Sequence, residues 1–176
     1  MTFEYKEWVP KGFDNNSRIW IYQSDRAFTN EEAVLVKDEL QEFSSQWHSH
    51  GNSINSYAHL FFNRFVVLMA DEREVVVGGC SMDSAVQFIR QLEDQFKVSL
   101  LNRQNLAFIQ DGNILTIPLS NLKEQLDNQF VTKDTLYFNN TILTIGDFLK
   151  SWIIPLKESW LASRISMKIC DCPEQD

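Results

Sequence analysis

A cysteine lies at the predicted start of a helix, directly after two glycines. The apolar run 75–77 ends at Gly78 and Gly79, and Cys80 precedes a segment with apolar residues at helical spacing, 82–96. A thiol at a helix N-terminus lies at the positive end of the helix dipole, which favours the nucleophilic thiolate. The unpaired N–H groups of such a turn could instead hold a phosphate or a carboxylate. The sequence therefore nominates this turn as the candidate site.

The residues around this cysteine allow more than one interpretation. Ser81 or Asp83 could cap the helix, and together with Gly79 they form the predicted ligand-binding turn. Asp83 argues against an activated nucleophile, because a neighbouring carboxylate disfavours a thiolate. In the alternative interpretation, Cys80 is a small buried residue and the glycines only form a turn.

Candidate partners of the thiol lie elsewhere in the chain. His48 and His50 are candidate bases for a nucleophilic Cys80, although a histidine at a helix end also has an ordinary stabilising role. Three arginines at predicted element boundaries could complete an anion site if they converge on the helix start: Arg26, Arg64 and Arg103. The alternative is that these arginines are solvated or form surface ion pairs.

Several known signatures are absent from the sequence. Val86 stands where a cysteine phosphatase loop needs arginine, and no second cysteine near Cys80 makes a Cys-x-x-Cys pair. The chain contains neither a phosphate-binding P-loop motif nor the glycine motif of dinucleotide-binding folds. The sequence therefore predicts no P-loop ATPase, no cofactor and no metal site, and it leaves enzymatic activity open.

Composition indicates a water-soluble chain. Its 176 residues carry a formal net charge of −8, which disfavours nucleic acid as a partner. No apolar run approaches the roughly 18 residues that span a bilayer, so membrane insertion is not predicted. Three cysteines do not form an even set of disulfides, which favours a reducing cytoplasm. We expect one domain over residues 1–165, followed by a mobile tail over 166–176.

Hydrophobic periodicity and turn residues predict the elements that position these groups. A capping box at Thr29 and Glu32 opens a helix near 30–48 that ends at Gly51, and a second helix covers 82–97. The remaining pattern is mainly strand, with hairpins turning near residues 63–64, 111–112 and 139–140, and a last helix over 145–152 ended by Pro155. This mixture predicts an α+β fold with a mainly antiparallel or mixed sheet and two principal helices.

Five segments of the chain resemble a small bacterial family that is commonly labelled "ABC transporter ATPase". They are residues 18–26, 47–51, 63–65, 79–84 and 138–140, and the similarity extends from about Trp8 to Trp160. The label implies nucleotide hydrolysis, which the missing P-loop contradicts, and the family contributes no catalytic residues. The resemblance implies a cytoplasmic bacterial protein.

Three functions are compatible with the sequence. The first is a cytoplasmic domain that binds a small anionic ligand or a protein partner at the Gly-Gly-Cys-Ser helix start. The second is a thiol-dependent enzyme with Cys80 as its nucleophile, and the third is a structural oligomer. The sequence identifies no substrate, partner or oligomeric state.

Overall fold

The computed structural model describes residues 3–163, whose contacts divide them into two compact units. The larger unit contains residues 3–103 and 140–151, and the smaller unit contains 104–139 and 152–163. Each unit combines an antiparallel sheet with helices, which confirms the α+β fold class. One domain over 1–165 stays a prediction, and the predicted tail over 166–176 lies outside the described residues.

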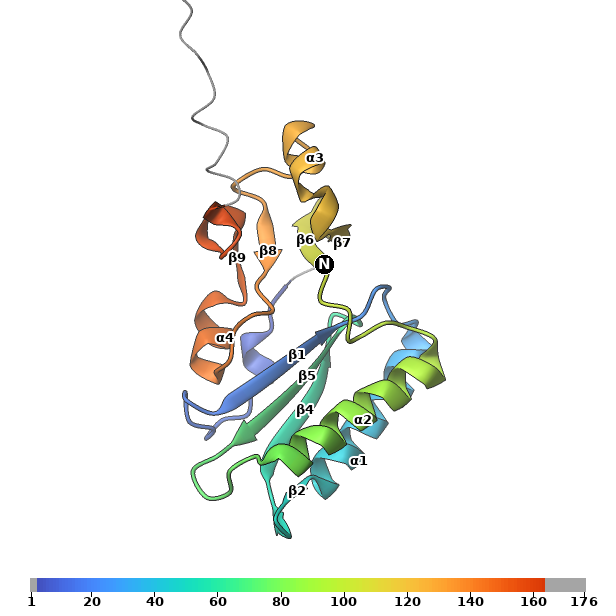
Figure 1. Ribbon diagram of the computed structural model, residues 1–176, viewed down its shortest axis with the longest axis vertical. Coiled ribbons are helices and arrows are strands. Elements are labelled where there is room, and N and C mark those ends of the chain that lie inside the picture. The colour runs from blue at the N-terminus through green and yellow to red at the C-terminus, as the bar shows by residue number, and fades with distance from the viewer. Residues whose placement is uncertain (1–2, 164–176) are drawn as a thin grey trace, which may run out of the picture. The chain divides into compact units, whose positions relative to one another are not determined.

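The larger unit is a three-stranded antiparallel sheet with two long helices packed side by side on one face (Figure 1). The strand order is β1-β5-β4. A short ribbon, β2 with β3, follows the first long helix. The elements are η1 (Lys6–Trp8), β1 (Arg18–Gln23), α1 (Asn30–Gln46), β2 (His48–Ser49), β3 (Asn52–Ser53), β4 (Asn55–Phe61), β5 (Phe65–Asp71), α2 (Gly79–Phe96) and α4 (Ile145–Ser151).

The central strand of this sheet is the one that the apolar run predicted. All seven residues of β5 are buried, because helices cover one face of the strand and other residues cover the opposite face. β4 and β5 form the predicted hairpin, in which Phe62 and Asn63 adopt positive φ. Every second side chain of a strand points to the same face of the sheet. On the face covered by α1 and α2, Val66, Leu68 and Ala70 of β5 pack with residues of both helices in one core.

The capping box predicted at the start of α1 is present. The Thr29 hydroxyl accepts the Glu32 N–H at 3.1 Å, and the Glu32 carboxylate accepts the Thr29 N–H at 2.8 Å. The Arg26 guanidinium also binds this carboxylate and is the largest cause that lowers the pKa of Glu32 from 4.5 to about 2. The helix is therefore fixed at its first turn by local contacts.

We expect the substitution Thr29→Ala to lower the free energy of unfolding by about 1 kcal/mol, because an N-cap hydroxyl satisfies a backbone N–H that otherwise has no partner. Urea denaturation followed by circular dichroism measures this difference. Thr29→Ser keeps the hydroxyl and serves as the matched control. Equal stability of the alanine and serine variants would contradict a stabilising cap.

The smaller unit is a four-stranded antiparallel sheet in the order β7-β6-β8-β9. Its elements are β6 (Asn105–Gln110), β7 (Asn113–Pro118), η2 (Leu119–Asn121), α3 (Leu122–Asp127), β8 (Leu136–Phe138), β9 (Ile153–Pro155) and η3 (Leu156–Glu158). The predicted turn at Asp111 and Gly112 joins β6 to β7, and both residues have positive φ as a type I′ turn requires. A separate apolar cluster, which includes Leu106 and Phe108, forms the core of this unit.

Three predicted element boundaries are wrong. β8 does not form a hairpin across Asn139 and Asn140, because it pairs with β6 and with the distant strand β9. The last helix ends at Ser151, and Pro155 belongs to β9 instead of terminating the helix. α1 ends at Gln46, so Gly51 is not its C-cap but part of the turn between β2 and β3.

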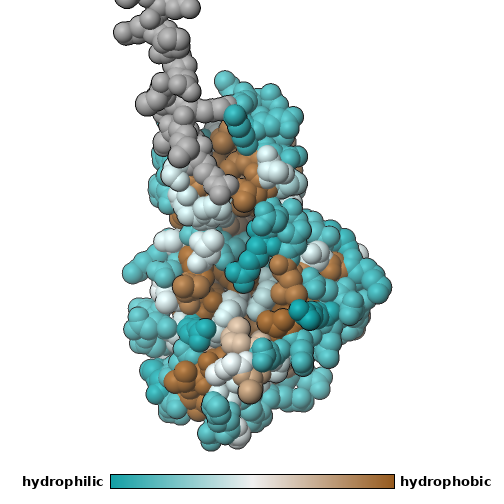
Figure 2. Space-filling view, in the orientation of Figure 1, coloured by the Kyte–Doolittle hydropathy of each residue, from teal (hydrophilic) through white to brown (hydrophobic). Residues whose placement is uncertain are grey.

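Within residues 3–163, no helix is both long enough and apolar enough to cross a membrane. Figure 2 shows a mainly hydrophilic surface in this view, on which apolar residues are exposed in separate groups. The surface in this view therefore has no single large apolar patch that would indicate an interaction site.

Candidate functional site

The predicted helix start is present, but its cap differs from the expectation. α2 begins at Gly79 with Gly78 as its N-cap, and no side chain of the described residues caps this end. Ser81 and Asp83 are therefore not capping residues. The Ser81 hydroxyl instead donates to the His48 carbonyl at 2.9 Å, which attaches the first turn of α2 to strand β2.

The loop before this turn is held by side chains that bind its backbone. The Ser49 hydroxyl donates to the Val76 carbonyl at 2.7 Å and accepts the Gly78 N–H at 3.3 Å. A Cβ atom at position 78 would lie 3.0 Å from His50 Nε2. Glycine at this position therefore leaves room for the imidazole of His50 beside the helix start.

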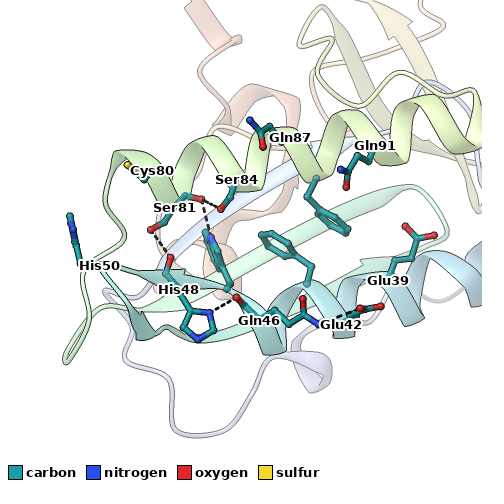
Figure 3. A pocket seen from close by; sticks show the side chains of 13 residues that line it. Glu39, Glu42, Gln46, His48, His50, Cys80, Ser81, Ser84, Gln87 and Gln91 are labelled. Atoms are coloured by element: carbon teal, nitrogen blue, oxygen red, sulfur yellow. Dashed lines mark hydrogen bonds between the residues drawn. The ribbon is translucent and has the colours of Figure 1, made fainter.

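An open groove of about 680 Å³ runs between α1 and α2 (Figure 3). This volume is typical of sites that bind small ligands. We call it the α1–α2 groove. Its lining combines aromatic rings, side-chain amides, carboxylates, two imidazoles and a thiol: Glu39, Glu42, Phe43, Gln46, Trp47, His48, His50, Cys80, Ser81, Ser84, Gln87, Phe88 and Gln91.

Aromatic rings form the floor of the groove. Phe43 of α1 and Phe88 of α2 stack with ring centroids 4.4 Å apart and planes 9° apart. Trp47 lies 5.3 Å from Phe43, and its indole N–H donates to the Ser81 carbonyl at 2.9 Å. These rings belong to or border the core of the larger unit, so the floor is rigidly supported.

Carboxylates and amides form the rim of the groove. Glu39 accepts a hydrogen bond of 2.6 Å from Gln95, and Glu42 accepts one of 3.3 Å from Gln46. A carboxylate can accept about four hydrogen bonds, so each retains acceptor capacity toward a ligand. The described lining contains no lysine or arginine, so the local field favours a cation over an anion.

The predicted catalytic residues share this groove but do not form a hydrogen-bonded dyad. Cys80 is exposed, and it lies with His50 at the end of the groove farthest from Glu39 (Figure 3). The His48 ring contacts the Gln46 carbonyl through Nδ1 and lies away from Cys80. Within the described part of the chain, no hydrogen bond connects the Cys80 thiol to an imidazole. The interpretation of Cys80 as a buried residue is wrong.

The predicted arginines do not reach the helix start. Arg26 donates to the carbonyl of Phe96, the last residue of α2, at 2.6 Å. An 18-residue helix is about 27 Å long, so Arg26 lies at the opposite end. Arg64 donates to the Asp25 carbonyl at 3.2 Å in the same region. Arg103 is close enough to Tyr22 to oppose the increase in its pKa that burial causes. The prediction that these arginines form an anion site around Cys80 is therefore wrong.

Two further predicted residues lie beside the groove instead of lining it. Gly79 and Asp83 are exposed near the start of α2, and neither contributes to the described lining. The residues that the sequence analysis missed are the polar stripes of both helices. Glu39, Glu42 and Gln46 on α1, and Ser84, Gln87 and Gln91 on α2, have the same three-then-four spacing, which places each set on one helix face.

Comparisons with models of known protein families, with curated proteins and with solved structures find no match to this chain. Membership of the "ABC transporter ATPase" family therefore stays a prediction. Among the described residues, no group of three or more histidine, cysteine, aspartate or glutamate side chains is placed to hold a metal ion.

Proposed function

We propose that the protein is a non-catalytic binding module whose α1–α2 groove holds a basic segment of a protein partner. One observation carries this proposal: Glu39 and Glu42 of α1 lie beside an aromatic floor in a lining without lysine or arginine. A location in a bacterial cytoplasm, which the resemblance and the odd number of cysteines imply, is part of the same proposal.

The chemistry of arginine suits this groove. A guanidinium is planar and weakly hydrated, so it stacks on aromatic rings and binds a carboxylate through two parallel N–H donors. The side-chain amides of Gln46, Gln87 and Gln91 add acceptors for its remaining donors. The net charge of −8 adds a long-range attraction for a basic partner. A small anion would meet two carboxylates in this groove.

We expect a blocked pentapeptide with two arginines, Ac-Gly-Arg-Gly-Arg-Gly-NH2, to bind more tightly than the same peptide with two glutamates. The substitutions Glu39→Gln and Glu42→Gln should each weaken binding of the arginine peptide about 3- to 10-fold, because each removes one charge partner. Titration followed by ¹⁵N NMR measures the affinity and shows whether the side-chain amides of Gln46 and Gln87 respond.

Glu124→Gln is the matched control, since it makes the same change in net charge at an exposed residue of α3. It should leave the affinity for the arginine peptide unchanged. An equal loss in all three variants would mean that net charge alone attracts the peptide, and the groove proposal would fail. Binding of inorganic phosphate at the backbone amides of Gly79–Ser81, with no response to the arginine peptide, would instead support the anionic-ligand hypothesis.

The thiol-dependent enzyme is the second candidate function. Its support is the exposure of Cys80 and the placement of His50 at the same end of the groove. Alkylation of Cys80 by iodoacetamide as a function of pH tests it, in a variant with Cys170 and Cys172 replaced by serine. A rate like that of an ordinary exposed thiol would remove this candidate.

A further inference from the structure

The two edges of the sheet in the larger unit differ in the contacts that the described residues make with them. Its edge strands are β1 and β4. At the start of β1, the Ile19 N–H donates to the Leu143 carbonyl at 3.0 Å, and Arg18 forms a bridge to Thr144. β4 pairs with β5 on one side, and no strand of residues 3–163 pairs with it on the other.

β4 lacks the charged residues and the proline that often protect an edge strand from pairing. Its sequence is Asn-Ser-Tyr-Ala-His-Leu-Phe, without a charged residue or a proline. Proteins commonly protect such edges with charge, proline, a bulge or a covering segment. The edge strands of the smaller unit, β7 and β9, each end at a proline, whereas β4 is seven residues long and unprotected in this way.

A groove of about 770 Å³ follows this edge. Seven consecutive residues, 53–59, line one side of it. Successive side chains of a strand point to opposite faces, so a cavity lined by every residue in turn runs along the backbone edge and not over one face. α1 forms the second wall through Lys37, Gln41, Ser44 and Ser45.

The chemistry of this β4-edge groove differs from that of the α1–α2 groove. Its lining is rich in hydroxyl and amide groups, with Lys37 as its cation and no carboxylate among the described lining residues. The charge of Lys37 is close enough to contribute to the low pKa of His59. A negative side chain at this end of the groove would therefore meet a favourable field.

A second copy of the protein does not suit this edge. α1 packs directly on β4, where the Ser56 hydroxyl donates to the Ser44 carbonyl at 2.9 Å. Pairing β4 with another β4 would place two such helices, each about 10 Å across, over strands only about 4.8 Å apart. A peptide strand that carries no helix of its own avoids this collision.

We propose that the open edge of β4 is a docking site for an extended, acidic segment of a protein partner, which adds as a fourth strand beside β4. Main-chain hydrogen bonds along the edge provide the pairing, and an acidic side chain opposite Lys37 orients the segment. This inference is independent of the function proposed for the α1–α2 groove, because the two grooves have different linings and opposite charge preferences.

Selection of random nonapeptides displayed on phage against the full chain tests this proposal. We expect the selected peptides to share an acidic residue and, when synthesised, to slow hydrogen exchange at alternate backbone amides within residues 55–60, those that do not face β5. Two N-methylated versions of a selected peptide are then compared, one methylated at the odd-numbered residues and one at the even-numbered residues. One version should lose binding and the other should keep it, because only every second residue of a strand directs its N–H toward a given neighbouring strand.

The substitution Lys37→Glu should weaken binding of the selected acidic peptide about 5- to 10-fold, because it replaces an attraction by a repulsion. Lys123→Glu makes the same charge change on exposed α3 and should have no effect. Three results would overturn the proposal. The selection could yield no peptide, or the selected peptides could protect other residues from exchange. Sedimentation velocity could also show a dimer that dissociates when a charged residue is introduced into β4.

Discussion

We expect the substitution Trp47→Ala to lower the free energy of unfolding by about 3 to 5 kcal/mol, the usual cost of removing a large aromatic side chain from a core. Trp47 is 3% exposed and packs 5.7 Å from Trp20 and 5.3 Å from Phe43, measured between ring centroids. Its backbone carbonyl also accepts the N–H of Ile54 at 3.0 Å. One side chain thus connects the end of α1 to the sheet and, through Ser81, to the first turn of α2.

Trp47→Phe separates the packing of the ring from its hydrogen bond. Phenylalanine keeps much of the apolar volume and loses the indole N–H, and the Ser81 carbonyl still accepts the Ser84 hydroxyl at 2.8 Å. We therefore expect the loss to be about 1 to 2 kcal/mol, well below that of the alanine variant. Urea denaturation gives both values. A loss below about 1 kcal/mol for Trp47→Ala would contradict the central position of this ring in the core.

Local signals predicted the elements whose stability is local. The capping box at Thr29 and the type I′ turn at Asp111 and Gly112 depend on neighbouring residues, and the structure contains both. The apolar run of β5 was also predicted, because a strand that is buried on both faces has no polar alternation. Asn139 and Asn140 also have the composition of a tight turn. The partner of β8 is instead a strand about fifteen residues away, and turn composition carries no information on that choice.

The end of α1 shows why one residue type can support two predictions. Gly51 has φ of +81°, which suits both a left-handed helix cap and the second position of a type I′ turn. His50 before it also has positive φ, at 50°, and the two residues join β2 to β3 as a turn. The ribbon that follows orients the His48 carbonyl toward Ser81, a contact between residues 33 apart.

Part of the candidate site could be predicted from the sequence, and the part that depends on contacts between distant segments could not. The sequence predicts Cys80, His48 and His50 at one site, and these residues line one groove. The carboxylates of Glu39 and Glu42 were missed because they approach α2 only when two helices pack side by side. Arg26 was assigned to the wrong end of α2, since a boundary residue shows that an element ends but not which other element it meets.

His59 should make the stability of the fold depend on pH below about 6.5. Its ring is stacked 5.1 Å from that of Trp8 and 5.9 Å from that of Tyr57, and burial, assisted by Lys37, lowers the pKa of His59 from 6.5 to about 4. Between these two values the unfolded chain binds a proton that the folded chain does not. Its contribution to stability is therefore complete above pH 6.5 and is lost as the pH falls toward 4.

We expect this loss to reach about 2 kcal/mol, after allowance for the partial exposure of the ring to solvent. His59→Phe keeps an aromatic ring between Trp8 and Tyr57 and removes the titrating group. Urea denaturation of both proteins at intervals from pH 7 to pH 4 isolates the effect, because every other histidine and carboxylate is common to the pair. The free energy of unfolding of the unsubstituted protein minus that of His59→Phe should decrease as the pH falls from 6.5 to 4 and stay constant above pH 6.5. A flat difference would mean that His59 takes up its proton in the folded state as easily as in the unfolded chain, and that the stack on β4 tolerates a charge.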